Sequence, residues 1–316
     1  MNAPTLTNVR QAEERVRLVG HRTPVMTSAQ LDELAGRHLV FKCENFQKIG
    51  AFKIRGAANF IFKLSDEVAR RGVVTHSSGN HGQAVALASR LRGIQAHIVM
   101  PTTASAVKRR AIEGYGGIVV DCAPNEAARD ATAQGVIDET GATFVPPYDH
   151  PDIIAGQATA ALELLEDLPE LEAVVAPVGG GGLLSGTAIA SHGLHGTIRV
   201  FGAEPEGADD AARSLAEGRL IPQDDPQTIA DGLLTSLGPL TYSIISEQVE
   251  RVVTVSEGEI VSAMRLVWER MKIVIEPSAA VAVAAVLSEE FRALEDLQHV
   301  GVILSGGNVD LDDLPW

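Results

Sequence analysis

The sequence predicts an α/β fold in which parallel sheets are covered by helices on both faces. Short runs rich in β-branched residues alternate with alanine-rich amphipathic stretches along most of the chain. The 316 residues are 45% hydrophobic, which is enough apolar material for a substantial core. Glycines cluster where several of the predicted strands end, and ligands of parallel sheets bind at such ends.

The elements follow from this alternation of patterns. The segments with the composition of buried strands are 38–43, 73–76, 96–100, 117–121, 173–178, 199–203, 251–255 and 300–305. The amphipathic segments that predict helices are 57–64, 82–92, 104–113, 126–140, 154–165, 183–191, 257–271 and 278–289. Because helices intervene between most of the strands, we expect the strands to run parallel.

Two turn-rich boundaries divide the chain into a larger and a smaller domain. The charged segment ARRGVV near Arg70 forms the first, and the turn FVPPYDHP, residues 144–151, forms the second. The residues between them have their own strand–helix repeats. We therefore expect residues 71–147 to form a small mobile domain, inserted into a large domain made of residues 1–70 and 148–316.

The composition excludes several classes of function. Acidic residues outnumber basic ones by 41 to 26, so a chain with a formal charge of −15 is repelled by nucleic acids and by anionic membranes. No apolar run has the length of a membrane span, and the N-terminal segment lacks the pattern of a secretory signal. Cys43 and Cys122 are far apart in the sequence, which fits a reducing compartment. We expect a cytoplasmic protein.

The most specific single motif is APVGGGGLLSG, residues 176–186. A buried strand runs into four consecutive glycines and then into a helix, so several backbone N–H groups can face one ligand. This arrangement predicts an anion cradle, most often for phosphate. A nicotinamide-dependent oxidoreductase is the competing interpretation. The spacing G-x-G-x-x-G is not met, but Glu204 follows the next strand, where a ribose-binding acid would lie.

Three further loops at predicted strand ends carry chemistry. Lys53 is flanked by Phe52 and Ile54 at the start of a helix, a setting that lowers the pKa of an amine and favours a nucleophile. THSSGNHGQA, residues 75–84, groups hydroxyl, amide and imidazole side chains around glycines. ILSGGNVD, residues 303–310, ends a strand with a hydroxyl that can bond a ring nitrogen. A lysine nucleophile, a phosphate cradle and such a hydroxyl are together what pyridoxal phosphate requires.

These motifs resemble a known family. AFKIRGA, SSGNHGQA, VGGGGLLSG, EPEGADD, IADG, MKIVIEPS and SGGNVD are similar, in this order, to motifs of the fold-type II pyridoxal-phosphate enzymes of the serine racemase, serine/threonine dehydratase and 3-hydroxyaspartate dehydratase group. The resemblance covers residues 16–310. It implies a tryptophan synthase β-like fold with two parallel-sheet domains, the smaller inserted in the larger. Ala51 departs from the pattern, since many relatives have serine there, and we expect little effect on the chemistry.

The resemblance also implies the cofactor site. Lys53 would bind pyridoxal 5′-phosphate covalently and act as acid and base on one face of it. Phe52 would pack against the ring, Asn80 would touch the ring hydroxyl, and Ser305 would bond the pyridine nitrogen. The residues that would hold the cofactor phosphate are Gly179, Gly180, Gly181 and Gly182.

A serine at the pyridine nitrogen has a consequence for the reaction. Without a carboxylate to keep this nitrogen protonated, the cofactor is a poorer electron sink, which favours loss of a β-leaving group over transamination. The predicted reaction is β-elimination of serine, threonine or 3-hydroxyaspartate to a keto acid and ammonia. Ser78 resembles the serine that racemases of the group use on the opposite cofactor face, which adds an expectation of serine or aspartate-type racemase activity.

Substrate and metal contacts are implied in the same way. The candidate substrate contacts are Ser77, Ser78, Asn80, His81, Thr235 and Arg129. Arg129 aligns with an arginine that can meet a second carboxylate, which would admit 3-hydroxyaspartate; an exposed helical arginine is the alternative. Glu204 and Asp210, with the carbonyl of Ala208, match a site for Mg²⁺, Ca²⁺ or Mn²⁺. A solvated acidic turn is the alternative.

A regulatory site is implied as well. The positions that match residues binding the activator ATP at a subunit interface are Gln83, Tyr115, Lys272 and Asn308. Such residues also serve packing in the homodimer that the family predicts. Two interpretations of another kind stay open: the nicotinamide-dependent oxidoreductase, which would use the glycine loop and Glu204, and a non-catalytic ligand-binding relative that keeps the fold.

Overall fold

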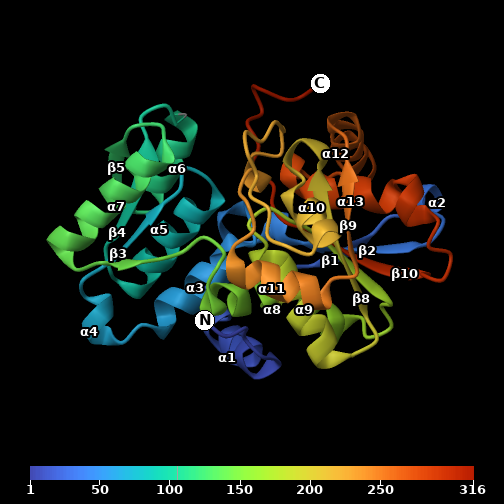
Figure 1. Cartoon of the computed structure of the whole chain (residues 1–316), viewed down its shortest axis with the longest axis horizontal. Coiled ribbons are helices and arrows are strands. Elements are labelled where there is room, and N and C mark those ends of the chain that lie inside the picture. Colours follow the sequence, from blue (N-terminus) through green and yellow to red (C-terminus); the bar gives the residue numbers. More distant parts are fainter. Residues whose placement is uncertain (105) are drawn as a thin grey trace.

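The computed structural model describes residues 1–104 and 106–316, which form two sheets with helices packed on their faces (Figure 1). The larger sheet has the strand order β1-β2-β10-β7-β8-β9, and the smaller sheet has the order β5-β4-β3-β6. In Figure 1 the smaller sheet and its helices form the lobe on the left. The predicted class, two parallel-sheet α/β domains, is confirmed.

The strands agree closely with the sequence prediction. The larger sheet contains β1 (Val25–Thr27), β2 (His38–Cys43), β7 (Ala173–Pro177), β8 (Arg199–Pro205), β9 (Arg251–Val255) and β10 (His299–Leu304). The smaller sheet contains β3 (Val73–His76), β4 (Ala96–Pro101), β5 (Ile118–Cys122) and β6 (Thr143–Phe144). Every predicted strand is confirmed within two residues at each end. The prediction lacks β1 and β6, because runs this short carry no readable period. β1 pairs antiparallel with β2, whereas the other described strand pairs are parallel.

The helices divide between the two sheets. Those in the part of the chain that forms the larger sheet are α1 (Leu6–Val16), α2 (Ala29–Ala35), α8 (Pro151–Asp167), α9 (Gly182–Leu194), α10 (Asp210–Glu217), α11 (Pro239–Gln248), α12 (Glu257–Met271), α13 (Pro277–Leu287) and α14 (Glu289–Arg292). Those that follow strands of the smaller sheet are α5 (Asn80–Arg92), α6 (Ala106–Gly114) and α7 (Glu126–Thr140). The helices that link the two parts are α3 (Lys53–Lys63) and α4 (Asp66–Ala69). The prediction lacks α1, α2, α4, α10, α11 and α14, and it starts α3 four residues too late.

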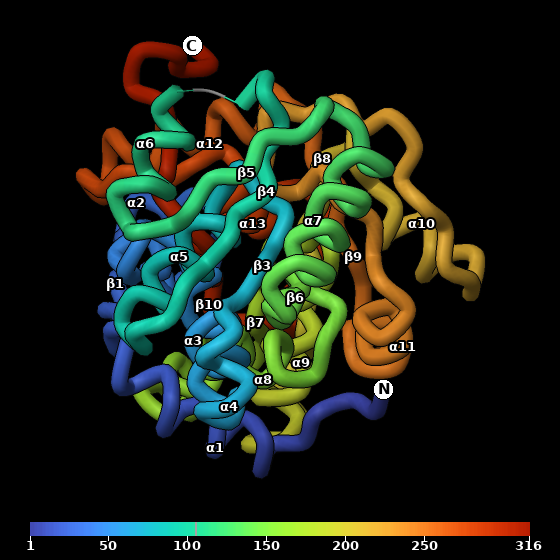
Figure 2. Tube along the Cα trace, turned by 90° about the vertical axis from the view of Figure 1, so that its left-hand side faces the viewer, coloured from blue at the N-terminus to red at the C-terminus, as the bar shows by residue number. Residues whose placement is uncertain are grey.

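Alternate residues of the strands face different cores, as the period of a strand requires. In β2, Phe41 belongs to a core with α2, α12 and α13, whereas Val40 belongs to a core with α8 and α9. In β10, Val302 and Ile303 divide in the same way. The smaller sheet has α5 and α6 on one face and α7 on the other (Figure 2).

The smaller sheet is an insertion in the sequence of the larger one, because β3 to β6 lie between β2 and β7 along the chain. The boundaries at residues 70/71 and 147/148 stay a prediction. Both cysteines are free and buried. Among the helices described, none is both long and apolar enough to cross a bilayer.

Candidate active site

The strand order of the larger sheet brings three loops to one edge. β10 lies between β2 and β7 and runs parallel to both. The loops after these strands are therefore neighbours, and they carry the residues before α3, the Ser305 segment and the glycine motif. Two backbone contacts join the first two loops: the Phe52 N–H donates to the Ser305 carbonyl at 3.0 Å, and Ala51 pairs with Gly306.

Lys53 is the first residue of α3, and its side chain is half-buried. Its amine donates a hydrogen bond to the carbonyl of Pro147 at 3.0 Å and lies 5.2 Å from the centroid of the Phe52 ring. Burial lowers the pKa of this amine to about 8, although the charge of Glu276 partly opposes the shift. A useful fraction of Lys53 is therefore neutral near neutral pH and able to attack a carbonyl carbon.

The glycine motif turns directly from β7 into α9. Gly181 has a φ of +85°, which other residues rarely adopt, and α9 begins at Gly182. A Cβ added to Gly180 would approach the Tyr148 ring to 2.3 Å, so only a bare backbone fits here. Because Tyr148 follows Pro147, one short segment contacts both the lysine amine and the glycine loop. Backbone N–H groups at a helix start, free of side chains, fit a phosphate.

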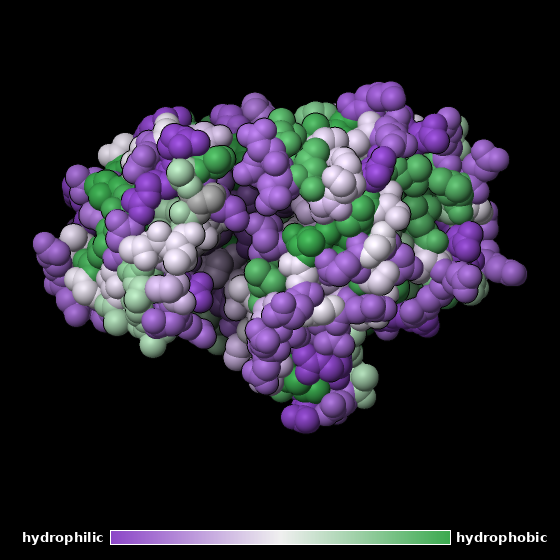
Figure 3. Space-filling view, turned by 90° about the horizontal axis from the view of Figure 1, so that it is seen from above, coloured by the Kyte–Doolittle hydropathy of each residue, from purple (hydrophilic) through white to green (hydrophobic). Residues whose placement is uncertain are grey.

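The loop between β3 and α5 meets the site from the smaller sheet. The Asn80 amide donates to both carboxylate oxygens of Glu276, at 3.0 and 3.2 Å, and so connects the two sheets. Ser77 and Ser78 are half-buried in the same loop, and the Gly79 N–H donates to the Ser77 hydroxyl at 3.3 Å. Figure 3 shows the surface hollowed between the two lobes that these loops join.

His81 is buried behind this loop. Its Nε2 hydrogen-bonds the Val145 carbonyl at 3.1 Å, and since a carbonyl only accepts, Nε2 carries the proton. Burial, together with the charge of Lys53, lowers the pKa of His81 to about 3. Its Nδ1 has no hydrogen-bond partner among the described residues. The ring is therefore neutral at physiological pH and can accept a hydrogen bond at Nδ1, but it cannot serve as an acid.

Glu276 is the site residue that sequence reasoning missed. It is 3% exposed and accepts hydrogen bonds from the Asn80 side chain and, at 3.1 Å, from the backbone N–H of Asn308. The side-chain amide of Asn308 in turn donates to the side-chain oxygen of Asn80 at 2.8 Å. Burial raises the pKa of Glu276 to about 7, and the Asn80 hydrogen bond partly opposes this rise. The signal in the sequence was an acid inside the apolar run IVIEP, directly before a helix.

The candidate metal ligands are Glu204, near the end of β8, and Asp210, the first residue of α10; they form a deeply buried pair, 0% and 1% exposed. Both oxygens of Glu204 accept backbone N–H groups from the start of α10, at 3.0 and 2.9 Å. Asp210 accepts the Leu237 N–H at 2.8 Å, and its second oxygen is buried without a partner among the described residues. The backbone of Ala208, also buried, lies between them in the chain.

Burial governs the charge of this Glu204–Asp210 pair. Burial raises the pKa of Glu204 well above its usual range, and the charge of Asp210 raises it further. Burial also raises the pKa of Asp210 to about 6. A divalent cation would stabilise both carboxylates, and oxygen donors suit Mg²⁺ or Ca²⁺. In the described part of the chain no group of three or more His, Cys, Asp or Glu side chains could hold a metal. A site here would need backbone carbonyls, such as that of Ala208, to complete it.

The two outer substrate candidates lie apart from this group. Arg129 is half-buried in the first turn of α7, where its charge opposes the rise in pKa that burial gives the Cys122 thiol. Thr235 is exposed in the loop after the short 3₁₀ helix Asp231–Leu233. Within the described residues, neither forms a hydrogen bond or ion pair with Lys53 or Glu276.

The four nucleotide candidates are scattered over several elements. Gln83 is buried in α5, and Tyr115 is half-buried after α6, with an arginine guanidinium 6.0 Å from its ring centroid. Lys272 is exposed, and its amine donates to a helix carbonyl at 2.5 Å. Asn308 contacts the active site through Asn80.

The buried amine of Lys53, the glycine cradle and the Ser305 loop, which is joined to Phe52, fit pyridoxal phosphate chemically. A family model described as pyridoxal-phosphate dependent enzyme matches residues 16–306. The chain belongs to this family. The resemblance expected from the motifs is confirmed.

Relatives of this pyridoxal-phosphate dependent enzyme match over their whole lengths. A β-hydroxyaspartate dehydratase from Paracoccus denitrificans (strain Pd 1222) is 48% identical over 318 residues, covering 100% of both chains. The crystal structure of serine racemase from Dictyostelium discoideum has a TM-score of 0.94 and 50% identity, covering 98% of this chain and 99% of that one. A pyridoxal 5′-phosphate-dependent aspartate racemase has a TM-score of 0.95 and 42% identity, covering 100% and 99%.

Family membership leaves the nicotinamide alternative without support. The structure gives a physical reason as well. Glu204 is fully buried, so a ribose hydroxyl cannot reach it.

Proposed function

We propose that this enzyme converts a β-hydroxy amino acid to a keto acid and ammonia by β-elimination. The observation that carries the proposal is the amine of the half-buried Lys53, which bonds the Pro147 carbonyl beside the glycine loop and whose pKa is lowered to about 8. The relatives reported above are a dehydratase of β-hydroxyaspartate, a serine racemase and an aspartate racemase. All three names imply removal of the proton on an amino-acid Cα.

Lys53 has two tasks in this proposal. It attaches the cofactor covalently, and afterwards its Nζ takes the proton from the substrate Cα. Bound pyridoxal phosphate supplies the electron withdrawal that makes this proton acidic. A pKa of about 8 suits both directions of transfer near neutral pH, since the amine accepts a proton readily and can return it.

Other residues hold and orient the cofactor. Phe52 would pack against the ring, Asn80 would face its hydroxyl, and Ser305 would offer a hydroxyl to the pyridine nitrogen. The phosphate would be held by Gly179, Gly180, Gly181 and Gly182. A hydroxyl partner would leave the ring nitrogen unprotonated, which would weaken electron withdrawal and favour loss of β-hydroxide over amino-group transfer.

A screen for keto-acid release tests this reaction. We expect the holoenzyme to release a keto acid and ammonia from at least one of L-serine, L-threonine and the 3-hydroxyaspartate isomers. Borohydride reduction should attach the cofactor to Lys53, as peptide mass spectrometry would show, and Lys53→Ala should abolish both label and turnover. Transfer of the amino group to an added keto acid, without elimination, would contradict the proposal.

Ser78 is proposed as a second acid/base for racemisation. It lies in the loop that joins the smaller sheet to Glu276 through Asn80, and it is accessible enough to meet a ligand. We expect Ser78→Ala to abolish inversion of serine or aspartate while retaining much elimination from the L-substrate. The ratio of the two rates, measured by chiral chromatography and keto-acid assay, controls for general damage. Unchanged inversion would end the idea.

Arg129 is proposed to select a second substrate carboxylate. Its guanidinium belongs to the smaller lobe, so reaching the substrate would require the lobes to approach each other. We expect Arg129→Ala to lower kcat/KM for 3-hydroxyaspartate more than for L-serine. The exposed Arg110→Ala in α6 is the matched control, with no change expected for either substrate. An equal loss for both substrates would contradict the role.

Ser77 and Asn80 are proposed as contacts of the shared α-carboxylate, with Thr235 nearby. The expected contact of His81 with that carboxylate is not retained, because its Nε2 proton is donated to Val145 and its Nδ1 can only accept.

The remaining assignments are proposals of the same kind. The unpartnered oxygen of Asp210 supports a divalent cation, Mg²⁺ foremost, bound by Glu204, Asp210 and the Ala208 carbonyl. The resemblance supports a cytoplasmic homodimer with an amino-acid substrate, and an ATP effector at the four nucleotide candidates. Sedimentation with and without ATP tests the homodimer and the ATP effector together. A monomer whose sedimentation does not change with ATP would contradict both.

A further inference from the structure

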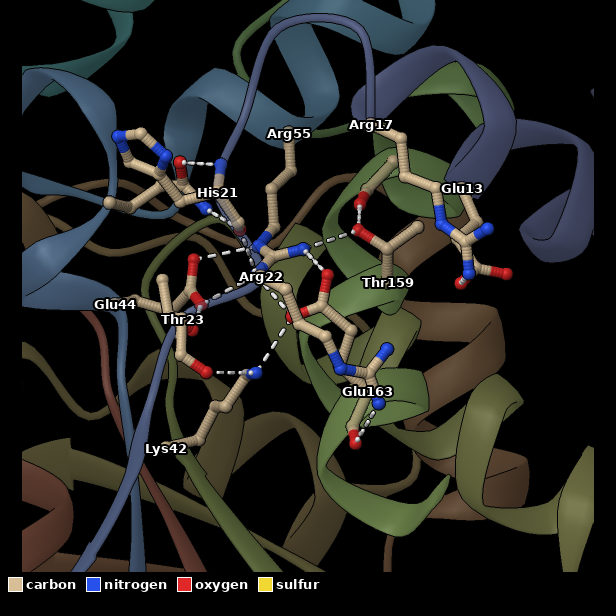
Figure 4. A network of polar contacts seen from close by, with 12 residues as sticks. Glu13, Arg17, His21, Arg22, Thr23, Lys42, Glu44, Arg55, Thr159 and Glu163 are labelled. Atoms are coloured by element: carbon tan, nitrogen blue, oxygen red, sulfur yellow. Dashed lines mark hydrogen bonds and ion pairs between the residues drawn. The ribbon is translucent and has the colours of Figure 1, made fainter. Parts of the chain in front are cut away.

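Two residues after Lys53, Arg55 lies in a group of charged side chains with almost no exposed surface. Figure 4 shows their polar contacts. Lys42, Glu44 and Arg55 are each 0% exposed, and Glu163 is 4% exposed. Together with Thr23 they form what we call the Arg55 cluster. None of these residues belongs to the site described above, and ionised groups are seldom buried this deeply without a purpose.

Arg55 is the centre of the cluster. Its Nε and Nη2 donate to the two oxygens of Glu44, at 2.7 and 2.8 Å. Its Nη1 and Nη2 donate to the two oxygens of Glu163, both at 2.8 Å, and Nη1 also donates to the Thr159 hydroxyl at 3.0 Å. Two bidentate pairs fix both the position and the plane of the guanidinium, which a single contact would not do.

The outer members close the cluster into a neutral unit. The Lys42 amine donates to Glu163 at 2.7 Å and to the Thr23 carbonyl at 2.9 Å, and the Thr23 hydroxyl donates to Glu44 at 2.5 Å. Two cations therefore face two carboxylates. A buried cluster of this kind gives little net stability compared with apolar side chains of the same size, so its benefit lies in a defined geometry.

The cluster joins segments that are distant in the sequence. Lys42 comes from the end of β2, and Glu44 begins the short 3₁₀ helix that follows this strand. Arg55 comes from α3, Glu163 comes from α8, and Thr23 comes from the segment before β1. Each acidic side chain contacts at least two of these segments. The first turn of α3 is thus fixed to the larger sheet and to the helix that covers it.

The contact between α3 and α8 needs such a fixed point. A Cβ added to Gly56 would approach Gln157 to 2.5 Å, and one added to Gly156 would approach the Gly56 backbone to 2.6 Å. The helices therefore touch backbone to backbone directly beside Arg55. The Gln157 side chain accepts the Gly56 N–H at 3.2 Å, and the charged bidentate pairs beside it further fix the relative position of the helices.

Lys53 lies between two anchors. On one side, the Phe52 N–H bonds the Ser305 carbonyl and so ties the chain to the loop after β10. On the other side, the Arg55 cluster begins two residues further along α3. The backbone of Lys53 has little freedom between these contacts.

We propose that Arg55 is a positioning residue, which holds the first turn of α3 through Glu44 and Glu163 so that the Lys53 amine is presented to the carbonyl carbon of the cofactor. The inference rests on the proposed role of Lys53. It assigns to the Arg55 cluster, which lies outside the site, the task of setting the position and orientation of the Lys53 amine.

The cluster acts through geometry and not through its charge. The influences on the pKa of Lys53 are burial and Glu276, and the cluster is neutral as a whole. Loss of the cluster should therefore change rates while leaving the pH dependence of the lysine in place. Misplacement of a reacting group by about 1 Å lowers a rate by up to about 100-fold.

A charge-balanced variant tests the proposal without leaving a buried charge alone. Arg55→Met together with Glu44→Gln removes one ion of each sign and keeps the Lys42–Glu163 pair at 2.7 Å. We expect a folded protein in which the rate of covalent attachment of pyridoxal phosphate to Lys53, followed by absorbance after mixing, falls about 10- to 100-fold. Visible circular dichroism of the bound cofactor should change, and kcat should fall more than KM rises.

The matched control is Lys63→Met, which removes a cation from the other end of α3 by breaking an exposed pair with Asp152. It should leave the attachment rate and the dichroism unchanged. A folded double variant that attaches the cofactor at the control's rate, with the same dichroism and kcat, overturns the proposal. If the double variant does not fold, the isosteric variant Thr23→Val is the test, because it removes one hydrogen bond to Glu44. A slower attachment of the cofactor supports the proposal, and an unchanged rate overturns it.

Failure of the proposed function gives a different result. If borohydride reduction labels no lysine in the wild-type protein, the role of Lys53 is wrong, whatever the variants do. If the wild type is labelled at Lys53 and the folded double variant is labelled equally fast, the role of Lys53 stands and that of Arg55 is wrong.

Discussion

The Arg55 cluster and the Glu204–Asp210 pair are two equally buried groups of carboxylates with opposite charge balance. In the Arg55 cluster each carboxylate faces a buried cation, and although burial raises the pKa of Glu163, Arg55 lowers it below its usual range. In the Glu204–Asp210 pair, burial raises both pKa values. The cation that acts on Asp210 is Arg213, which lies near the surface and pairs with Asp209.

The difference lies between carboxylates paired with cations inside the fold and carboxylates that are proposed to bind a cation from outside. A balanced cluster is complete within the chain, and every charge in it has its partner in the fold. An unbalanced pair, with one oxygen lacking any partner in the described residues, is completed by a proton or a cation from outside. Burial alone does not distinguish the two cases; the presence of a buried cation beside the carboxylate does.

Breaking the balanced cluster has the largest expected effect. Arg55→Met alone leaves two buried carboxylates with one cation, so the free energy of unfolding should fall by about 3–5 kcal/mol, measured in urea. Adding Glu44→Gln should restore part of this loss, because it removes the unpaired charge. A single variant that loses less than about 1 kcal/mol would show that the cluster tolerates imbalance.

The Glu204–Asp210 pair should respond to pH and Mg²⁺. The folded pKa of Asp210 is about 6, above its ordinary 3.8, so the folded state holds its proton more tightly than the unfolded chain. Without metal, the free energy of unfolding should therefore fall by about 2–3 kcal/mol as pH rises from about 4 to about 7. The proposed Mg²⁺ site requires the ionised pair, so Mg²⁺ should raise Tm at about pH 8 and have little effect at about pH 5.

Asp210→Asn is the control for that response. It removes one charge from the pair and retains an oxygen for the Leu237 N–H. The variant should be at least as stable as the metal-free wild type at about pH 8, and its Tm should not respond to Mg²⁺. A wild-type Tm that changes with neither Mg²⁺ nor EDTA would contradict the proposal that a cation binds this pair.

Glu276 tests whether an unbalanced carboxylate controls the lysine. Its charge raises the pKa of Lys53 against the effect of burial, so Glu276→Gln should lower that pKa below about 8. The inflection at which the rate of cofactor attachment rises with pH should then move to lower pH, measured over about pH 5 to 10. A profile that stays in place would mean that Glu276 is neutral in the working enzyme.

The exposed pair Lys63–Asp152 should have the smallest effect. Its side chains are 49% and 24% exposed, and water screens such pairs. Lys63→Met should change the free energy of unfolding by no more than about 0.5 kcal/mol, measured in urea. A loss comparable to that of Arg55→Met would mean that burial is not what separates the two ion pairs on α3.

Much of the site could be predicted from local patterns. The strand ends before Ser77, Gly179 and Ser305 are marked by β-branched runs that stop at glycines, and each is found where it was expected. The elements that were missed are very short, such as β6, or lie next to irregular loops, such as α10. Glu276 and the burial of Arg55 could not be predicted, because an acid in an apolar run and an arginine near a helix start are each compatible with a solvated side chain.

The amino-acid sequence determined by itself which segments are strands, which loops can approach a phosphate and which lysine can be a nucleophile, since these depend on neighbours within a few residues. The tertiary structure decided which charges balance one another. Lys42 and Glu163 are 121 residues apart, and Asn80 and Glu276 are 196 apart. Their pairing depends on β10 lying between β2 and β7 and on the smaller sheet meeting the larger. An ionisable group acquires its pKa from whatever the fold packs around it.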